Sequence, residues 1–185
     1  NIITKNTDSP FSKEDITVTF KLTTDSIVNV NIVDNNNNPV KHRVINKELI
    51  PGNYSVKWDG YNEAGNIIDG SYKVILRAVK QSDPNYVNEK YLFVFVDNTK
   101  PQITITSPEP NNFVKEVVDI RGLVAEQNYK HTVIEKGYGN DPAQYIFVQD
   151  NLKINNDVIG KIDTRALANE LYTVKLTSYD IAYNK

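Results

Sequence analysis

The sequence predicts an all-β protein made of two antiparallel β-sandwiches in tandem. Apolar and polar residues alternate with a period of two, which is the pattern of strands with one face in a core. Clusters of Gly, Pro, Asn and Asp interrupt this pattern every ten residues or so, as in sandwich folds. The 185 residues also suffice for two sandwich domains of about 100 residues each.

Alternation defines the strands of the first half. In Ile16–Leu22 every second residue is apolar and Thr or Lys stands between. Three further segments are predicted strands of the same kind, at residues 28–32, 54–58 and 72–78, and the continuous apolar run at residues 91–96 is also of strand length. Turn-forming residues separate them at positions 34–39, 51–53, 59–60, 64–66 and 69–70.

The second half repeats this organisation after a short polar seam at residues 97–101. Predicted strands begin at Ile103 and continue at residues 113–121, 129–136, 143–149, 158–163 and 171–179. Helix signals are thin, and only residues 164–169 are compatible with one helical turn. We therefore place the first domain at residues 1–97 and the second at residues 98–185.

Composition excludes several classes of function. The net charge is −2, with 21 basic and 23 acidic residues mixed along the chain, so a nucleic-acid binder is not expected. No apolar run approaches the roughly 20 residues that a membrane span needs. Cysteine is absent, which excludes disulfides and Cys-based metal sites. Met is absent even at position 1, so we expect Asn1 to be an internal position of a longer protein.

Residues 51–74 carry a specific motif. Its fixed positions are Trp58, Asp59, Gly60, Gly65, Asp69, Gly70 and Tyr72. This order and spacing resembles the immunoglobulin-like domain at the C-terminus of the flagellar hook-capping protein, a domain also found in many secreted bacterial proteins. The resemblance implies that Trp58 lies in the core at a strand end, and that Asp59-Gly60 turns the chain outward.

Residues 129–184 carry a second, more divergent motif. It includes Gly137-Tyr138-Gly139, Asp163-Thr164 and the run from Asp180 to Asn184. This resembles immunoglobulin-like modules of bacterial subtilisin-like cell-envelope proteases and surface-layer proteins. The two resemblances imply tandem immunoglobulin-like, or fibronectin type III-like, sandwiches at the surface of a Gram-positive bacterium or secreted from it. Its partners would be other domains of the parent chain.

No catalytic or cofactor-binding constellation stands out. A Ser-His-Asp triad needs a histidine, and the two histidines, His42 and His131, both lie in predicted strands. There is no G-x-S-x-G elbow, and the eight glycines are scattered rather than gathered in a phosphate-binding loop. We therefore predict that this fragment is not an enzyme.

One metal hypothesis remains open. Asp97 and Asn98 at the seam, together with Asp180, offer the hard oxygen ligands of an interdomain calcium site. Calcium takes six to eight oxygens, and few can be identified here. The alternative is that these Asp and Asn side chains only cap turns.

The eleven tyrosines suggest a possible sugar-binding platform. Tyr54, Tyr72 and Tyr172 are in register with core positions, which favours packing instead. Four others, in loops or at edges, are candidates for exposure: Tyr61, Tyr138, Tyr145 and Tyr183. The loop at residues 137–142 is the first place to expect a recognition surface, although a plain hairpin connection is the alternative.

Three functions follow from these observations. The main interpretation is a non-catalytic accessory or spacer module, for which the resemblance implies a subtilisin-like protease as the neighbouring domain. The second is an adhesive module that binds a glycan or a host protein. The third is an assembly domain of a surface layer or of the flagellar hook cap, in which self-association is the function.

Overall fold

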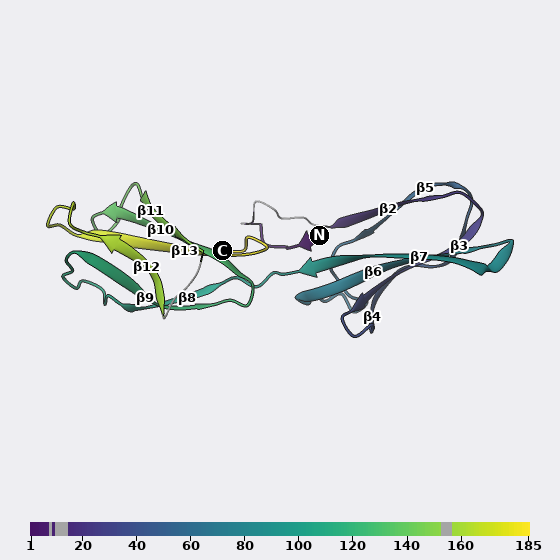
Figure 1. The fold of residues 1–185 in the computed structure, drawn as a ribbon, viewed down its shortest axis with the longest axis horizontal. Coiled ribbons are helices and arrows are strands. Elements are labelled where there is room, and N and C mark those ends of the chain that lie inside the picture. The colour runs from purple at the N-terminus through teal and green to yellow at the C-terminus, as the bar shows by residue number, and fades with distance from the viewer. Residues whose placement is uncertain (8, 10–14, 153–156) are drawn as a thin grey trace. The chain divides into compact units, whose positions relative to one another are not determined.

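The computed structural model describes residues 1–7, 9, 15–152 and 157–185. The chain divides into two compact units, Asn1–Thr99 (unit 1) and Lys100–Lys185 (unit 2), both drawn in Figure 1. The described residues form strands and turns with no helix, so the predicted all-β class is confirmed. Among these residues there is accordingly no helix long and apolar enough to span a bilayer.

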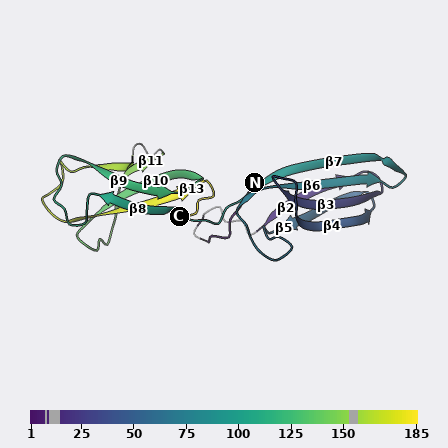
Figure 2. The same ribbon diagram turned by 90° about the horizontal axis from the view of Figure 1, so that it is seen from below.

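Unit 1 is a sandwich of two sheets. Its strands are β1 (Ile2–Ile3), β2 (Ile16–Leu22), β3 (Ser26–Asp34), β4 (Pro39–Leu49), β5 (Gly52–Trp58), β6 (Gly70–Lys80) and β7 (Asp83–Val96). One sheet has the order β1-β7-β6-β3-β4 and the other pairs β2 with β5, as Figure 2 shows from a second direction. Every pairing is antiparallel except that of β1 with β7.

The core of unit 1 lies between these two sheets. Strand β3 supplies Val28, Val30 and Ile32, which are fully buried because alternate residues of a strand point to the same face. The buried cluster contains Ile3, Ile16, Leu22, Val28, Val30, Ile32, Trp58, Tyr72, Val74, Val94 and Val96. All strands of this unit except the edge strand β4 therefore contribute a buried side chain to the core.

Unit 2 is a second sandwich. Its strands are β8 (Gln102–Ser107), β9 (Val117–Ala125), β10 (Tyr129–Tyr138), β11 (Ile146–Asn151), β12 (Val158–Asp163) and β13 (Tyr172–Asp180). One sheet has the order β12-β9-β8 and the other β11-β10-β13. All of these pairings are antiparallel.

The core of unit 2 is small and closely packed. Its buried cluster consists of Ile120, Ile134 and Ile162, with Val148 and Leu176 against it. Two glycines mark close approaches within the sandwich. A Cβ at Gly160 would collide with the Ile134 side chain, and one at Gly122 would collide with the Thr104 carbonyl. Glycine is needed at these places because the neighbouring atoms occupy the space of a side chain.

Several strand boundaries differ from those predicted. The strand predicted at residues 113–121 begins at Val117, because Phe113 is fully exposed and Glu116 takes a left-handed φ of 62°. Residues 164–169 form no helix but a turn in which Leu167 N–H donates to the Thr164 carbonyl at 3.0 Å. A segment of six residues is too short to sustain helical hydrogen bonding by itself.

One strand of unit 1 was not predicted, and another is longer than predicted. Strand β4 was not predicted, because most of its side chains are polar and exposed and its pairing with β3 is interrupted by bulges. Strand β7 begins at Asp83 rather than at residue 91, because its first half pairs with β6 while both of its faces are exposed. Alternation cannot detect a strand that buries neither face.

Trp58 should dominate the stability of unit 1. It is 1 % exposed, so Trp58→Ala leaves a large cavity and is expected to cost about 3–5 kcal/mol. Urea unfolding followed by circular dichroism measures this loss. Tyr91→Ala, which truncates an exposed aromatic ring of the same unit, is the control and should cost far less. Equal midpoints for the two variants would contradict this account of the core.

Candidate functional site

The motif of residues 58–72 forms the connection from β5 to β6, which we call the β5–β6 loop (residues 59–69). The buried rings of Trp58 and Tyr72 flank it and meet edge to face, with centroids 5.2 Å apart. The Trp58 Nε1–H donates to the Tyr61 carbonyl at 2.9 Å, and the Tyr72 hydroxyl donates to the Ile68 carbonyl at 2.6 Å. Each ring thus packs in the core while its polar atom holds the loop.

Tight turns shape the β5–β6 loop between these two anchors. Gly60 and Gly65 adopt φ values of 87° and 79°, in the left-handed region that favours glycine. The Asp59 carboxylate accepts the Tyr61 N–H at 3.2 Å, and the Asn62 carbonyl accepts the Gly65 N–H at 3.2 Å. Asp59, Gly60 and Gly65 therefore serve as turn formers.

Asp69, the last residue of the loop, holds the segment that follows β7. Its carboxylate accepts four hydrogen bonds, from the backbone N–H and side-chain amide of Asn98 and from the N–H and hydroxyl of Thr99, at 2.6 to 3.0 Å. The Asn98 side-chain oxygen in turn accepts the Lys5 N–H at 2.6 Å. Asp69 and Asn98 thus connect the β5–β6 loop, the end of β7 and the segment after β1.

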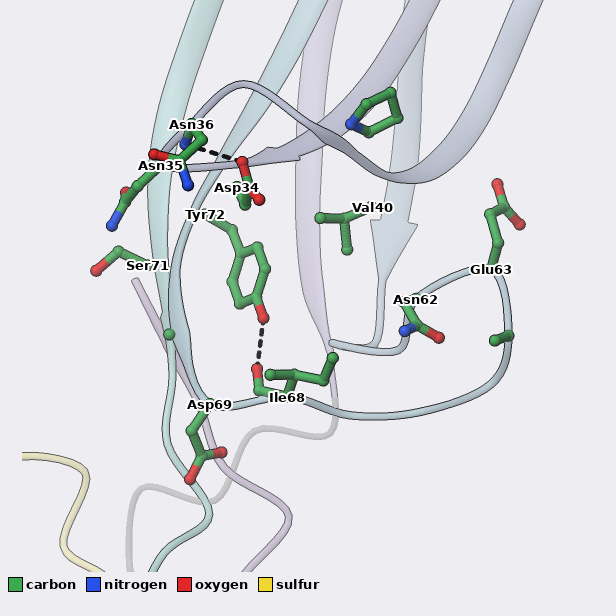
Figure 3. A pocket seen from close by; sticks show the side chains of 13 residues that line it. Asp34, Asn35, Asn36, Val40, Asn62, Glu63, Ile68, Asp69, Ser71 and Tyr72 are labelled. Atoms are coloured by element: carbon green, nitrogen blue, oxygen red, sulfur yellow. Dashed lines mark hydrogen bonds between the residues drawn. The ribbon is translucent and has the colours of Figure 1, made fainter.

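The β5–β6 loop also borders a hollow of about 580 Å³ in unit 1. Figure 3 shows Tyr72 at its centre, with Asp34 and Asn36 on one side and Ile68 and Asp69 on the other. Carboxylates and amides form much of its lining, namely Asp34, Asn35, Asn36, Asn62, Glu63 and Asp69. The hollow is therefore acidic and rich in hydrogen-bonding groups.

The carboxylates of this hollow are already bonded to the protein's own loops. Asp34 accepts hydrogen bonds from the Asn38 side chain and backbone, which lower the pKa of its carboxyl below the ordinary value. Glu63 accepts the His42 N–H at 2.7 Å, and this bond lowers the Glu63 pKa. Burial raises the pKa of the Tyr72 hydroxyl, and the nearby Asp69 and Asp34 add to the rise. These groups order loops, and none is placed as a base beside a nucleophile.

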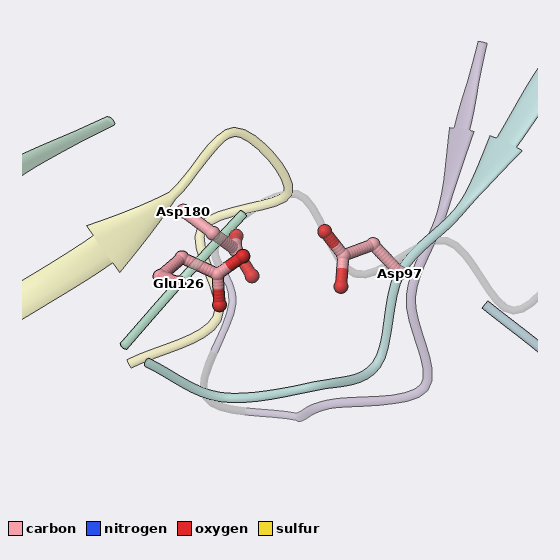
Figure 4. Close-up of side chains that lie close together, drawn as sticks. All are labelled: Asp97, Glu126 and Asp180. Carbon is pink, nitrogen blue, oxygen red and sulfur yellow. The ribbon is translucent and has the colours of Figure 1, made fainter. Parts of the chain in front are cut away.

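The predicted calcium ligands belong to both units (Figure 4). In unit 1, the Asp97 carboxylate accepts the Thr99 N–H at 3.3 Å, and Asn98 is bonded as described above. In unit 2, the Asp180 carboxylate accepts the Asn184 N–H at 2.9 Å and the Asn184 side-chain amide at 2.6 Å. Each side chain therefore has a turn-capping partner within its own unit.

Glu126 is an acidic residue of this region that was not among the predicted calcium ligands. Its carboxylate comes within 4.8 Å of that of Asp180 in unit 2, and it also accepts the Asn128 N–H at 2.7 Å. The acid-x-Asn spacing at Glu126 and Asn128 is the signal that could have marked a capped turn between β9 and β10. The interdomain calcium site, which takes ligands from both units, stays a prediction.

The exposed aromatic residues differ from those predicted. Of the four tyrosine candidates only Tyr138 is mostly exposed, and Tyr61, Tyr145 and Tyr183 are half-buried. Lys130 and Lys175 lie over the rings of Tyr183 and Tyr145. Tyr91 and Phe93, which lie on one face of β7, are instead 62 % and 61 % exposed. Sequence reasoning had assigned these two residues to an apolar strand without asking which face is buried.

The predicted recognition loop at residues 137–142 is a packed connection. Strand β10 continues through Tyr138, and a Cβ at Gly137 would collide with the Pro142 ring. The Thr173 hydroxyl donates to the Gly139 carbonyl at 2.7 Å and so ties the loop to β13. This geometry matches the alternative of a plain hairpin connection.

Removing the Asp69 carboxylate should destabilise the segment of unit 1 that follows β7. Asp69→Ala deletes all four acceptor contacts and is expected to cost about 1–2 kcal/mol in urea unfolding. Amide exchange at Asn98 and Thr99 should accelerate in the same variant. Asp59→Ala, which removes one such contact, is the matched control. Unchanged exchange at both amides would show that Asp69 does not hold this segment.

The calcium hypothesis predicts a melting temperature that rises with added CaCl₂ and falls with EDTA, because a ligand that binds only the folded state stabilises it. Asp180→Asn should abolish the calcium response if the carboxylate is a ligand. Equal melting temperatures in calcium and in EDTA would leave turn capping as the role of these residues.

Comparison with known protein families finds a match within unit 1. Residues 5–82 match the model of the FlgD Ig-like domain family. Among solved structures, FlgD from P. aeruginosa is similar at 22 % identity and a TM-score of 0.34, over 61 % of this chain and 74 % of that chain. The FN1–FN3 domains of chicken CNTN1 are similar at 12 % identity and a TM-score of 0.38, over 99 % of this chain and 63 % of that one.

A search of curated proteins finds no match. The residues that match the family model nevertheless coincide with whole strands of the unit 1 sandwich. The matched range begins just after β1 and ends just before β7. Residues 5–82, which lie within the sandwich of unit 1, are therefore similar to the FlgD Ig-like domain.

Proposed function

We propose that the chain is a non-catalytic assembly module of an extracellular bacterial protein, and that unit 1 associates with further copies of the chain. The match of residues 5–82 to the FlgD Ig-like domain carries this proposal. It favours the hook-cap type of assembly domain over the accessory or spacer module. The immunoglobulin-like domain is non-catalytic, which agrees with the lack of a triad, elbow or phosphate loop in the sequence.

One surface of unit 1 suits such an association. We call it the outer face of unit 1, and it is the side of the β7-β6 pair away from the core, with Phe93, Tyr91, Val87, Ile75 and Val79. Tyr91 and Phe93 are 62 % and 61 % exposed, and their rings meet edge to face at 5.6 Å. Neighbouring exposed aromatic side chains on a sheet surface mark sites of protein interaction.

Charged residues share this face with the apolar ones. Lys73 stands opposite Phe93 and lies 5.4 Å from the centroid of the Tyr91 ring. Arg77 and Glu89 stand opposite each other between the Ile75–Tyr91 and Val79–Val87 pairs. Two such faces would bury the four aromatic rings, and the oppositely charged Arg77 and Glu89 could pair across the interface.

The parent protein is part of the proposal as well. An extracellular or cell-surface location, a Gram-positive source and a neighbouring subtilisin-like protease stay predictions from the resemblances. So does an adhesive role toward a glycan or a host protein. A spacer module would be monomeric at every concentration, whereas an assembly module would not, and this difference gives the test.

Sedimentation of the chain over a wide concentration range should show reversible self-association. Tyr91→Ser with Phe93→Ser should weaken it by at least about tenfold in Kd, because two exposed rings leave the interface. Tyr138→Ser with Phe147→Ser removes two rings of similar exposure from unit 2 and should leave the association unchanged. A chain that stays monomeric throughout would contradict assembly and favour the spacer.

A further inference from the structure

The sequence contains two Asp-Gly pairs, Asp59-Gly60 and Asp69-Gly70, one at each end of the β5–β6 loop. An Asp-Gly pair is prone to spontaneous isomerisation, because glycine puts no side chain beside the backbone nitrogen that attacks the aspartyl carboxyl group. Both aspartates are exposed, so solvent access does not distinguish them. The hydrogen bonds of the two carboxylates, in contrast, differ greatly.

Hydrogen bonds hold the Asp69 carboxylate away from the nitrogen of its own glycine. Each of its two oxygens accepts two hydrogen bonds, from Asn98 and Thr99, in a segment distant in sequence. Gly70 is the first residue of β6 and pairs with Val96. These bonds must break before the Asp69 carboxyl carbon can reach the Gly70 nitrogen, so isomerisation there requires a local opening of the structure.

The Asp59 carboxylate is held much less firmly. In the described part of the chain it accepts one hydrogen bond, from the Tyr61 N–H at 3.2 Å. This bond closes a turn of side chain and backbone around the Gly60 nitrogen, and it therefore keeps the carboxyl group close to that nitrogen. Gly60 lies outside the strands, and among the described residues no acceptor of its N–H is found.

We propose that Asp59 is a site of spontaneous isomerisation to isoaspartate in the folded chain, and that hydrogen bonding protects Asp69 from the same reaction. The contrast between two identical dipeptides carries this inference, because their intrinsic chemistry is alike and their bonding is not. The reaction does not depend on self-association through the outer face of unit 1. Either proposal can fail while the other holds.

The reaction needs water and no other reagent. The Gly60 nitrogen bonds to Cγ of the protonated Asp59 carboxyl group, and the N–H proton leaves with the carboxyl OH as water. The resulting five-membered succinimide then takes up one water molecule. When the bond between the Asp59 carbonyl carbon and the Gly60 nitrogen is the one that breaks, the main chain runs through Cγ and the former backbone carbonyl becomes a carboxylate. The mass of the chain is unchanged.

Isomerisation at this position would act on the anchor of the β5–β6 loop. Isoaspartate adds one carbon to the main chain directly after Trp58, and it removes the side-chain acceptor of the Tyr61 N–H. The Trp58 Nε1–H donates to the Tyr61 carbonyl at 2.9 Å across this same stretch of backbone. The modified chain should therefore lose this hydrogen bond, and unit 1 should unfold at a lower denaturant concentration.

A single peptide reports both sites. The folded full chain is incubated for weeks at physiological temperature and then digested with trypsin, which cleaves after Lys57 and Lys73 and releases residues 58–73. Electron-transfer fragmentation distinguishes isoaspartate from aspartate at each position of this peptide. Isoaspartate should form about tenfold faster at Asp59 than at Asp69, because more than one hydrogen bond of Asp69 must break first.

Three controls test whether the fold causes this difference. In guanidinium chloride the two rates should agree within about twofold, because neither carboxylate keeps its native partners. Asn98→Ala removes an amide donor to Asp69 and should raise the rate at Asp69 several-fold without changing the rate at Asp59. Asp59→Glu keeps the charge but requires a six-membered ring, so it should abolish the product at position 59.

Four results would overturn the proposal. Isomerisation at Asp69 could equal or exceed that at Asp59 in the folded chain. The folded chain could give no isoaspartate at Asp59 during a period in which the unfolded chain does. The tenfold preference could persist in guanidinium chloride, in which case local sequence sets the rates. Finally, an unchanged rate at Asp69 in the Asn98→Ala variant would show that hydrogen bonding does not protect it.

Discussion

The contact between Trp58 and Tyr72 governs the organisation of unit 1. Trp58 is the last residue of β5 and Tyr72 the third residue of β6, and their ring centroids lie 5.2 Å apart in the core. Their polar atoms reach back to the Tyr61 and Ile68 carbonyls, so eleven residues of loop lie between two buried anchors. A loop held at both ends by core residues loses little further entropy when its turns form.

Hydrogen bonds connect the β5–β6 loop to the first and last segments of unit 1. Asp69 is held in place next to Tyr72, and its carboxylate bonds Asn98 and Thr99. Asn98 then holds the Lys5 backbone, beside the parallel pairing of Ile3 with Val96. The motif therefore does more than form a turn. It connects the β5–β6 crossing between sheets to the first and last segments of unit 1.

Sequence reasoning located the elements whose side chains alternate between core and water. Strands β2, β3, β5 and β6 were found because their apolar residues fill the core, and β12 was found with its observed bounds. Strand β4 was missed because an edge strand with bulges keeps its backbone pairing without a regular apolar face. A strand that is stabilised by backbone pairing alone is hard to recognise in a single sequence, because its side chains show no regular apolar pattern.

The motif residues were likewise located from sequence, but their partners were not. The spacing of Asp69-Gly70 predicts a turn, whereas the bonds from Asp69 to Asn98 and Thr99 join residues about thirty positions apart. The exposure of Tyr91 and Phe93 depends on which face of the sheet the second sheet covers, and alternation cannot decide that when both faces of a strand carry apolar residues.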